Sequence, residues 1–236
     1  MQKFILTIFT VLGFVACNTS AKSQAEQQSE KGPKNGLVQT YNEDGSISAS
    51  IQYKNNVRHG LASDYYTDGK LRAEIEYAMG LKEGLATWYH KNGIAYRVTP
   101  YKNDQKHGVQ KKFYEDGSLM SELSFAENYP GIGLKEFNKS GQERRVKTTI
   151  ILGEKTALED GSWRVEVRLN NKVKEVELFQ GSLINNAFMH GGLKPINKTA
   201  NSGFAIIPKG QKQVGIVAKY STRYKNDRVL TGTAKL

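Results

Sequence analysis

Cysteine is almost absent from this chain of 236 residues, which contains only Cys17. A single cysteine excludes a disulfide framework within the chain and a metal site built from several thiolates. Serine, histidine and aspartate residues do not occur in a spacing typical of hydrolases. His90 and His190 have no evident nucleophile or base near them in the sequence. We therefore expect no enzyme activity, no bound metal and no cofactor.

The first 17 residues have the pattern of an export signal. Lys3 precedes an apolar run over residues 4–16, which has the length of a signal core and is too short to span a bilayer. The run ends in Ala16-Cys17, which resembles the lipidation site of bacterial lipoproteins, where the cysteine is acylated and becomes the mature N-terminus. An acylated cysteine predicts stable membrane anchoring through Cys17. The alternative is an ordinary secretory signal that is cleaved near Ala21.

The segment that follows predicts a flexible tether over residues 18–35. Residues 18–34 contain no aromatic or large aliphatic side chain, so they cannot bury enough surface to fold. Asn18 is not the aspartate that retains many lipoproteins in the inner membrane, and no acidic residue occurs before Glu26. We expect a lipid-anchored protein of the cell envelope, in the outer membrane and facing the periplasm.

Positive charge is concentrated in the C-terminal part of the chain. Residues 36–144 contain 14 basic and 14 acidic side chains, whereas residues 145–236 contain 16 basic and seven acidic ones, a net charge of +9. This change near residue 145 coincides with the end of a sequence repeat. It predicts a domain boundary there.

A repeat of 24 residues organises the middle of the chain. Glycine recurs at this spacing at Gly36, Gly60, Gly84 and Gly108, and Gly131 follows after 23 residues. Counted from each glycine, apolar residues occupy offsets one, five, eleven and seventeen, an odd-numbered pattern that is typical of β-strands. Asp-Gly or Asn-Gly at offsets eight and nine predicts a type I′ turn, in which both central residues have positive φ. A second turn follows offset seventeen, so each unit predicts one hairpin whose odd-numbered side chains face inward.

The sequence Tyr53-Lys-Asn-Asn-x-x-His-Gly-Leu61, followed by Tyr65-Tyr-x-Asp-Gly-Lys-Leu71, recurs in part between Tyr101 and Leu119. In these motifs the chain resembles the MORN-repeat family, specifically the repeat variant of the YwqK-like antitoxin group, over about residues 36–141. The resemblance implies a sheet of antiparallel hairpins. It also implies membrane proximity, scaffolding or toxin neutralisation, and it brings no catalytic residues.

Aromatic side chains interrupt the otherwise polar, even-numbered face of the predicted hairpins. A row of exposed aromatic residues is typical of a surface that binds a protein or a sugar. The alternative is a β-bulge that changes the register after Gly93. The candidate binding residues are Tyr66, Trp88, His90, Tyr96 and Tyr114.

Two further pairs recur at equivalent positions two units apart, at a separation of about 10 Å in a sheet. His59 and His107 stand directly before a repeat glycine. We interpret them as turn residues, because metal–nitrogen bonds of about 2.1 Å leave no common metal position. Glu74 and Glu122 lie far from any identifiable cleft, and we interpret them as solvated charges rather than a glycosidase pair.

Residues 145–236 predict about six or seven more strands and a small immunoglobulin-like β-sandwich. Residues 162–169 alternate between apolar and polar side chains, and Asn170-Asn171 predicts a type I′ turn into a partner strand over residues 172–179. Basic side chains on one face of such a hairpin attract anionic lipid headgroups or acidic envelope polymers, and we expect no nucleic acid. The alternative is a solvated basic face. The candidate contact cluster is Arg164, Arg168, Lys172 and Lys174.

The sequence thus predicts an all-β protein in four parts. These are a lipoprotein signal over residues 1–17, a tether over 18–35, a MORN-like array of antiparallel β-hairpins over 36–144 and a basic β-sandwich over 145–236. We expect a non-catalytic envelope lipoprotein whose repeat sheet and basic domain bind a protein partner or an envelope polymer near the membrane. The alternative is a toxin-neutralising immunity protein or antitoxin.

Overall fold

A computed structural model describes residues 34–145, 147–171, 173, 175–199 and 202–236. These residues form one compact unit that contains strands and turns and no helix. The described part of the chain accordingly offers no helix that could cross a membrane. The all-β prediction is confirmed, and residues 1–33, which include the predicted signal and most of the tether, lie outside the described residues.

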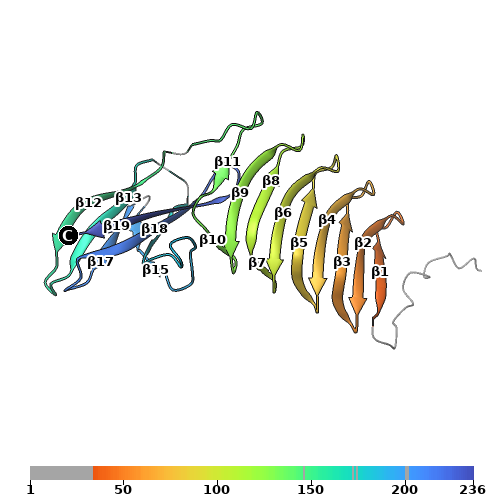
Figure 1. Cartoon of the computed structure of the whole chain (residues 1–236), viewed down its shortest axis with the longest axis horizontal. Helices are drawn as coiled ribbons and strands as arrows, with labels where there is room; N and C mark the ends of the chain where they lie inside the picture. Colours follow the sequence, from red (N-terminus) through yellow and green to blue (C-terminus); the bar gives the residue numbers. More distant parts are fainter. Residues whose placement is uncertain (1–33, 146, 172, 174, 200–201) are drawn as a thin grey trace, which may run out of the picture. The chain divides into compact units, whose positions relative to one another are not determined.

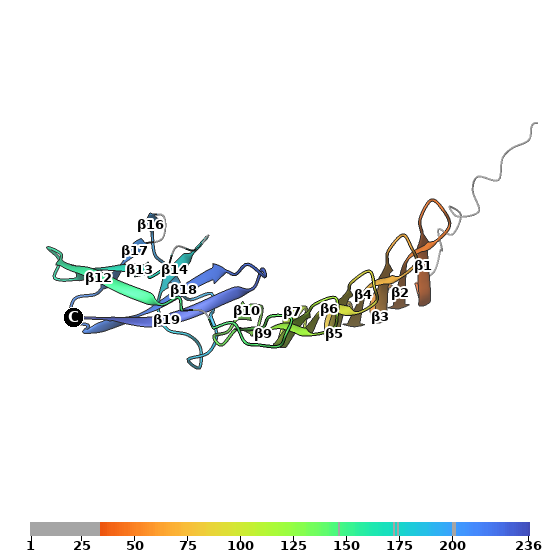
Figure 2. The ribbon, with the colours of Figure 1, turned by 90° about the horizontal axis from the view of Figure 1, so that it is seen from above.

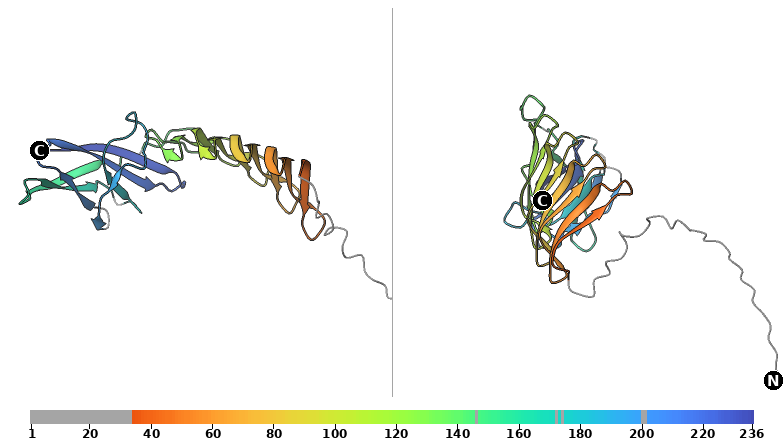
Figure 3. Two further views of the ribbon diagram at one scale, coloured as in Figure 1. Left: turned by 90° about the horizontal axis from the view of Figure 1, so that it is seen from below. Right: turned by 90° about the vertical axis from the view of Figure 1, so that its right-hand side faces the viewer.

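The repeat region forms one antiparallel sheet of 11 strands. Its long strands lie side by side in sequence order (Figure 1), and they form a single layer when the sheet is viewed along its surface (Figures 2 and 3). The short strand β7 pairs with β6, and β11 pairs with β9. The strands are β1 (Gly36–Tyr41), β2 (Ile47–Lys54), β3 (Val57–Tyr65), β4 (Leu71–Ala78), β5 (Leu81–Tyr89), β6 (Ala95–Lys102), β7 (Gln105–Lys106), β8 (Gly108–Phe113), β9 (Leu119–Ala126), β10 (Tyr129–Pro130) and β11 (Lys135–Glu136).

Two kinds of turn alternate along this sheet. The turns that join one repeat to the next are type I′, because both central residues have positive φ, as in Asn55 (51°) and Asn56 (67°). Met79-Gly80 and Asn103-Asp104 repeat this conformation. The second turn of each predicted unit is therefore confirmed.

The Asp-Gly turns inside each hairpin differ from the prediction. Gly69 has a φ of 78°, but Asp68 does not have positive φ. The Tyr66 carbonyl accepts from the Gly69 N–H at 2.9 Å, and the Tyr66 N–H donates to the Lys70 carbonyl at 2.7 Å. This is a type I turn closed by a glycine bulge, so the predicted type I′ conformation is wrong here. The Asp68 carboxylate favours the type I turn because it accepts from the Lys70 N–H at 3.2 Å.

A separate register shift, which lies in the strands next to this turn, decides which face the first strand of each hairpin presents. Asp64 pairs with Ala73, but Tyr65 pairs with Leu71, so the register shifts by one residue between them. The same shift occurs at the corresponding turn of every repeat. As a result, Leu61 shares a face with Glu76 rather than with the apolar side chains of β4. The prediction that odd-numbered side chains of both strands face inward is therefore wrong for the first strand.

The buried face of the sheet combines odd-numbered residues of the second strands with even-numbered residues of the first strands. Its most buried members are Ala73, Tyr77, Ala86, Thr99, Gln110, Lys112, Ser121, Leu123 and Phe125. The array ends in a degenerate unit, as predicted: β11 pairs with β9, and the following loop repeats the turn geometry with a φ of 78° at Gly141. Leu134 packs there against Leu123 and Phe125.

The C-terminal residues form two four-stranded sheets in the orders β12-β13-β17-β16 and β15-β14-β18-β19. This is the strand order of an immunoglobulin sandwich, with A-B-E-D in one sheet and C′-C-F-G in the other. Val165 and Val167 of β13 share a core with Leu178 of β14 and with Ile216 and Ala218 of β18. The predicted sandwich is confirmed. Its strands are β12 (Ile150–Ala157), β13 (Trp163–Leu169), β14 (Glu177–Gln180), β15 (Lys194–Pro195), β16 (Lys198–Thr199), β17 (Ser202–Ile207), β18 (Gln213–Ser221) and β19 (Asp227–Lys235).

One predicted hairpin of the sandwich does not form. β13 pairs with β12 and β17, whereas β14 pairs with β15 and β18 in the other sheet. Asn170 and Asn171 do not have positive φ, so they do not form the predicted type I′ turn. The Asn170 side chain instead binds the β12 side of the fold, where it accepts from the Thr149 N–H at 2.8 Å and donates to the Lys147 carbonyl at 2.8 Å.

The bulge makes the glycine at each Asp-Gly turn conformationally necessary. We expect Gly69→Val to lower the free energy of unfolding by about 1–3 kcal/mol, because a β-branched residue is strained at positive φ. A Cβ atom at Gly69 would meet no atom within 4 Å, so the effect isolates backbone conformation. The matched control is Gly69→Asn, because asparagine tolerates this conformation. Urea unfolding measures both variants, and equal stability of the two would contradict the bulge.

Candidate functional site

Three of the aromatic candidates tie neighbouring hairpins together. The Tyr66 hydroxyl donates to the Tyr89 carbonyl at 2.8 Å, and the Tyr114 hydroxyl donates to the Phe137 carbonyl at 2.8 Å. His90 Nε2 lies 3.1 Å from the Phe113 carbonyl, an arrangement that requires a proton on Nε2. All three residues are half-buried and occupy the same repeat position, and each reaches a carbonyl 23 residues further along the chain. Their polar atoms are thus used within the sheet.

The other two aromatic candidates, Trp88 and Tyr96, both lie in the third repeat. Trp88 shares the buried face with Ala73 and Arg97, and the Arg97 guanidinium lies 3.9 Å from the centre of the Trp88 ring. The Tyr96 ring meets the His90 ring edge to face at 5.2 Å. The register change proposed for this repeat is present, but it is the bulge common to all repeats rather than an irregularity of this one.

The opposite edge of the sheet carries a contact that joins the two strands within each hairpin. A cation lies over the aromatic ring of the following strand in four successive repeats, at distances of 4.8–5.6 Å. Each of these contacts is favourable by about 0.5–1 kcal/mol where the cation is exposed. The pairs are Lys34 with Tyr53, Arg58 with Tyr77, Lys82 with Tyr101 and Lys106 with Phe125.

The residue directly before each repeat glycine contacts the backbone of the next turn between repeats. Asn35 Oδ1 accepts from the Asn55 N–H at 2.8 Å, and Glu83 Oε2 accepts from the Asn103 N–H at 2.8 Å. His59 occupies the equivalent position, with Nδ1 3.5 Å from the Met79 N atom. These contacts agree with the interpretation of His59 as a turn residue. In the described residues, no group of three or more His, Cys, Asp or Glu side chains is arranged to hold a metal ion.

The face opposite the buried one carries an exposed row of apolar side chains. We call Leu37, Leu61, Leu85 and Val109 the apolar ladder; 44–59 % of each residue is exposed. They pair in the register with Gln52, Glu76, Pro100 and Ser124, so the row crosses the sheet in line. The sequence pattern shows these residues as a repeating apolar position. The predicted face was wrong because the pattern does not indicate the register shift beside each Asp-Gly turn.

The predicted basic cluster is only partly described. Arg164 and Arg168 are exposed on β13, opposite the core residues Val165 and Val167, and the Arg164 guanidinium lies 4.8 Å from the centre of the Phe204 ring. Lys172 and Lys174 lie outside the described residues. The hairpin that was predicted to bring the four together is absent, because β13 and β14 belong to different sheets.

A buried polar junction joins the last repeat to the β18–β19 turn of the sandwich. Glu136 is 3 % exposed; its Oε1 accepts from Thr222 Oγ1 at 2.6 Å and from Asn226 Nδ2 at 2.8 Å, and Arg228 Nη2 lies 3.5 Å from its Oε2. Lys112, 4 % exposed, donates to the carbonyls of Tyr224 at 3.1 Å and Lys225 at 2.9 Å. Burial and the nearby Arg97 charge lower the pKa of Lys112 to about 8. These contacts lie 86–113 residues apart in sequence, so no local pattern indicates them.

Comparison with known families places the repeats. The family model described as MORN repeat variant matches residues 34–55, 58–79, 82–103 and 106–127. Each matched segment contains one Asp-Gly or Asn-Gly hairpin and ends at a type I′ turn. No curated protein matches the chain. The four segments between residues 34 and 127 thus match the MORN repeat variant, and together they make up less than half of the chain.

The low pKa of Lys112 predicts a pH-dependent stability. Between about pH 8 and the ordinary value of 10.5, the unfolded chain binds more protons at Lys112 than the folded one, so the free energy of unfolding rises with pH. We expect the stability of the wild type relative to Lys112→Met to increase over this range by at most about 1.4 kcal/mol per pH unit. Urea unfolding at several pH values above and below 8 measures the difference.

The neighbouring lysine supplies the control for this measurement. Lys111 is exposed, and its Nζ lies 3.4 Å from Glu122 Oε1 at the surface, so Lys111→Met makes the same substitution outside the buried junction and serves as the matched control. If wild type and Lys112→Met show parallel pH profiles, Lys112 does not titrate as described.

Proposed function

We propose that the protein is a non-catalytic lipoprotein of the cell envelope whose repeat sheet binds a protein partner close to the membrane. The observation that carries this proposal is the apolar ladder, which places one exposed apolar side chain per repeat in line across four repeats. Single exposed leucines are common on protein surfaces, but an aligned row of them is typical of an interaction surface.

The geometry of the ladder favours a protein over a sugar polymer. Equivalent positions lie two strands apart, so the four side chains span about 30 Å of a single-layer sheet. An extended protein segment or a second sheet could cover this length and bury all four. Between them lie the polar side chains of Gln52, Glu76 and Ser124, which suit the mixed composition of protein interfaces.

We propose no catalytic role because the candidate side chains form hydrogen bonds with the backbone. The polar atoms of Tyr66, His90 and Tyr114 bind backbone carbonyls of the next hairpin. His190 Nε2 likewise lies 2.9 Å from the Ser182 carbonyl, and its Nδ1 accepts from the Gly192 N–H at 3.0 Å. Groups held in this way are poor candidates for a nucleophile or a general base.

The membrane part of the proposal rests on the N-terminal signal and on the basic sandwich. Arg164 and Arg168 are exposed on the outer face of β13, where anionic headgroups or an acidic envelope polymer could reach them. We propose lipid attachment at Cys17 and a location in the outer membrane, facing the periplasm. Toxin neutralisation is the second proposal, and it rests on the resemblance to the YwqK-like group alone.

The apolar ladder can be tested by adding charge to it. We expect Leu61→Asp combined with Leu85→Asp to weaken binding of the captured partner by more than about tenfold, because buried apolar contacts at interface centres dominate affinity. Both positions are exposed, so the fold should tolerate the change. The measurement is affinity capture of the full chain from detergent-solubilised envelope, with mass spectrometry to quantify partners.

The matched control adds the same charge elsewhere. Asn55→Asp combined with Gln105→Asp alters two exposed residues at the repeat-joining edge of the sheet, away from the ladder, and should leave capture unchanged. Recovery of the same partners in equal amounts by both double variants would contradict the proposed surface. Recovery of one toxin in a one-to-one complex through the ladder would support the neutralising role.

The anchor is tested separately. We expect Cys17→Ser to move the protein from the membrane fraction to the soluble fraction, because diacylated cysteine supplies the stable attachment. Fractionation of cells with immunoblotting measures the distribution, and metabolic labelling with a fatty acid reports acylation directly. Membrane attachment that persists in the variant without fatty-acid incorporation would refute lipid anchoring at this residue.

A further inference from the structure

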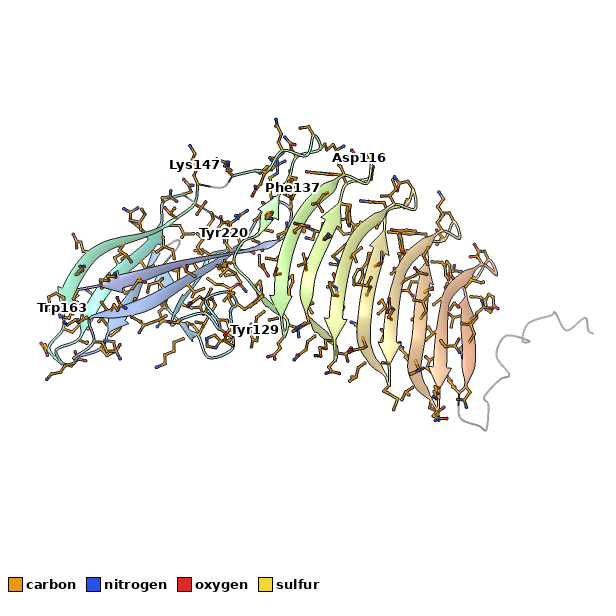
Figure 4. The ribbon with its side chains drawn as sticks, in the orientation of Figure 1. Asp116, Tyr129, Phe137, Lys147, Trp163 and Tyr220 are labelled. Atoms are coloured by element: carbon orange, nitrogen blue, oxygen red, sulfur yellow. The ribbon has the colours of Figure 1, made fainter. Side chains whose placement is uncertain are left out.

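A pocket lies beside the junction between the last repeat and the sandwich. Its volume is about 710 Å³, within the range of small-molecule sites. The segment after β11 contributes Arg144, Arg145 and Thr148 to its wall, and the end of β18 and the following turn contribute Tyr220 and Arg223. Tyr220 is labelled in Figure 4.

The pocket has an excess of unpaired positive charge. Of its two carboxylates, Glu136 is already bound by Thr222, Asn226 and Arg228. Glu175 is the other, and within the described residues neither it nor any other carboxylate forms an ion pair with Arg144, Arg145 or Arg223. Guanidinium groups match the oxygen atoms of carboxylates and phosphates in geometry as well as in charge.

The two best-placed arginines are held in position by one tyrosine. The guanidinium carbons of Arg144 and Arg223 lie 5.4 and 4.7 Å from the centre of the Tyr224 ring, and Arg223 Nη2 donates to the Tyr224 hydroxyl at 2.9 Å. Burial raises the pKa of Tyr224, but the hydrogen bond between its hydroxyl and that of Tyr114 and the charges of Arg144 and Arg223 outweigh burial and lower the pKa overall. The two guanidinium charges make the local potential positive.

Two buried polar groups beside this charge have no partner among the described residues. Tyr220 is 5 % exposed, and its hydroxyl makes no hydrogen bond to any of them. The Nε atom of Arg144 is likewise buried without an acceptor in this part of the chain. Buried tyrosine hydroxyls and guanidinium N–H groups are normally hydrogen-bonded, so both point to a missing acceptor at the pocket wall.

We propose that this pocket binds a small organic anion. A carboxylate or phosphate group would accept hydrogen bonds from Arg144, Arg223 and the Tyr220 hydroxyl. The pocket is much larger than a single ion, and Val173 and the Tyr220 ring in its lining supply apolar surface for the rest of the ligand. The site is independent of the apolar ladder, which lies on β1, β3, β5 and β8.

The test uses the full chain in a non-ionic detergent with three probes at millimolar concentration: phenyl phosphate, benzoate and inorganic phosphate. Isothermal titration calorimetry measures affinity. We expect phenyl phosphate or benzoate to bind at one site per chain and more tightly than inorganic phosphate. Arg144→Gln and Arg223→Gln should each weaken binding by about tenfold, since each removes a charge-assisted contact.

Tyr220→Phe keeps the ring and removes only the unpartnered hydroxyl, so it keeps the test valid if an arginine variant fails to fold. We expect about fivefold weaker binding in this variant. The matched control is Arg72→Gln, because Arg72 is an exposed arginine on β4 that pairs with Asp64 and does not line the pocket. The proposal is overturned if no probe binds, if inorganic phosphate binds as tightly as the organic anions, or if Arg72→Gln weakens binding as much as the pocket variants do.

Discussion

The one-residue register shift beside each Asp-Gly or Asn-Gly turn is the constraint on which the repeat sheet depends. It leaves one extra residue on the second strand, Arg72 in the second repeat, so the first strand turns its even-numbered side chains toward the buried face. The alanine, threonine and glutamine side chains of this face are small or hydrogen-bonded, as in the Thr99 hydroxyl that donates to Gln110 at 3.0 Å. The same register shift places the larger apolar side chains at offset one in solvent. The composition of both faces thus follows from one change of strand register that recurs in every repeat.

A sheet in a single layer cannot rely on a thick core, and this one is held together along its edges. At the Asp-Gly edge, side chains at one repeat position bind carbonyls of the next hairpin; at the other edge, cations cover aromatic rings. The last repeat needs a different neighbour, and the sandwich supplies it. Lys112 and Glu136 are buried there, and polar groups of the β18–β19 turn take the place of water as their hydrogen-bond partners. Such a buried pair of ionisable groups favours one docking geometry over others.

The sequence predicted the number and position of the hairpins because the 24-residue spacing and the period of two are local signals. It could not predict which face the offset-one residues take, since the apolar pattern does not mark the register shift beside each Asp-Gly turn. Asn-Asn was also ambiguous: it forms a type I′ turn at Asn55-Asn56 but not at Asn170-Asn171, where the chain crosses to the other sheet. Their place on the even-numbered face singled out Tyr66, His90 and Tyr114 without revealing that they bind carbonyls. The pocket beside Tyr220 depends on contacts between distant segments, which no periodicity reports.

The contacts between neighbouring repeats are the same all along the array, and this has a consequence for how the protein can change length. Each unit meets its neighbours through the same few positions, so a whole unit could be duplicated or deleted without creating a new kind of contact. Each such event would move the sheet's first strand by about 10 Å relative to its last. The end of the array must stay the same, because Lys112 of β8 and Glu136 of β11 make the contacts with the sandwich. The array can therefore act as a molecular ruler with one invariant end, whose reach is set by counting repeats.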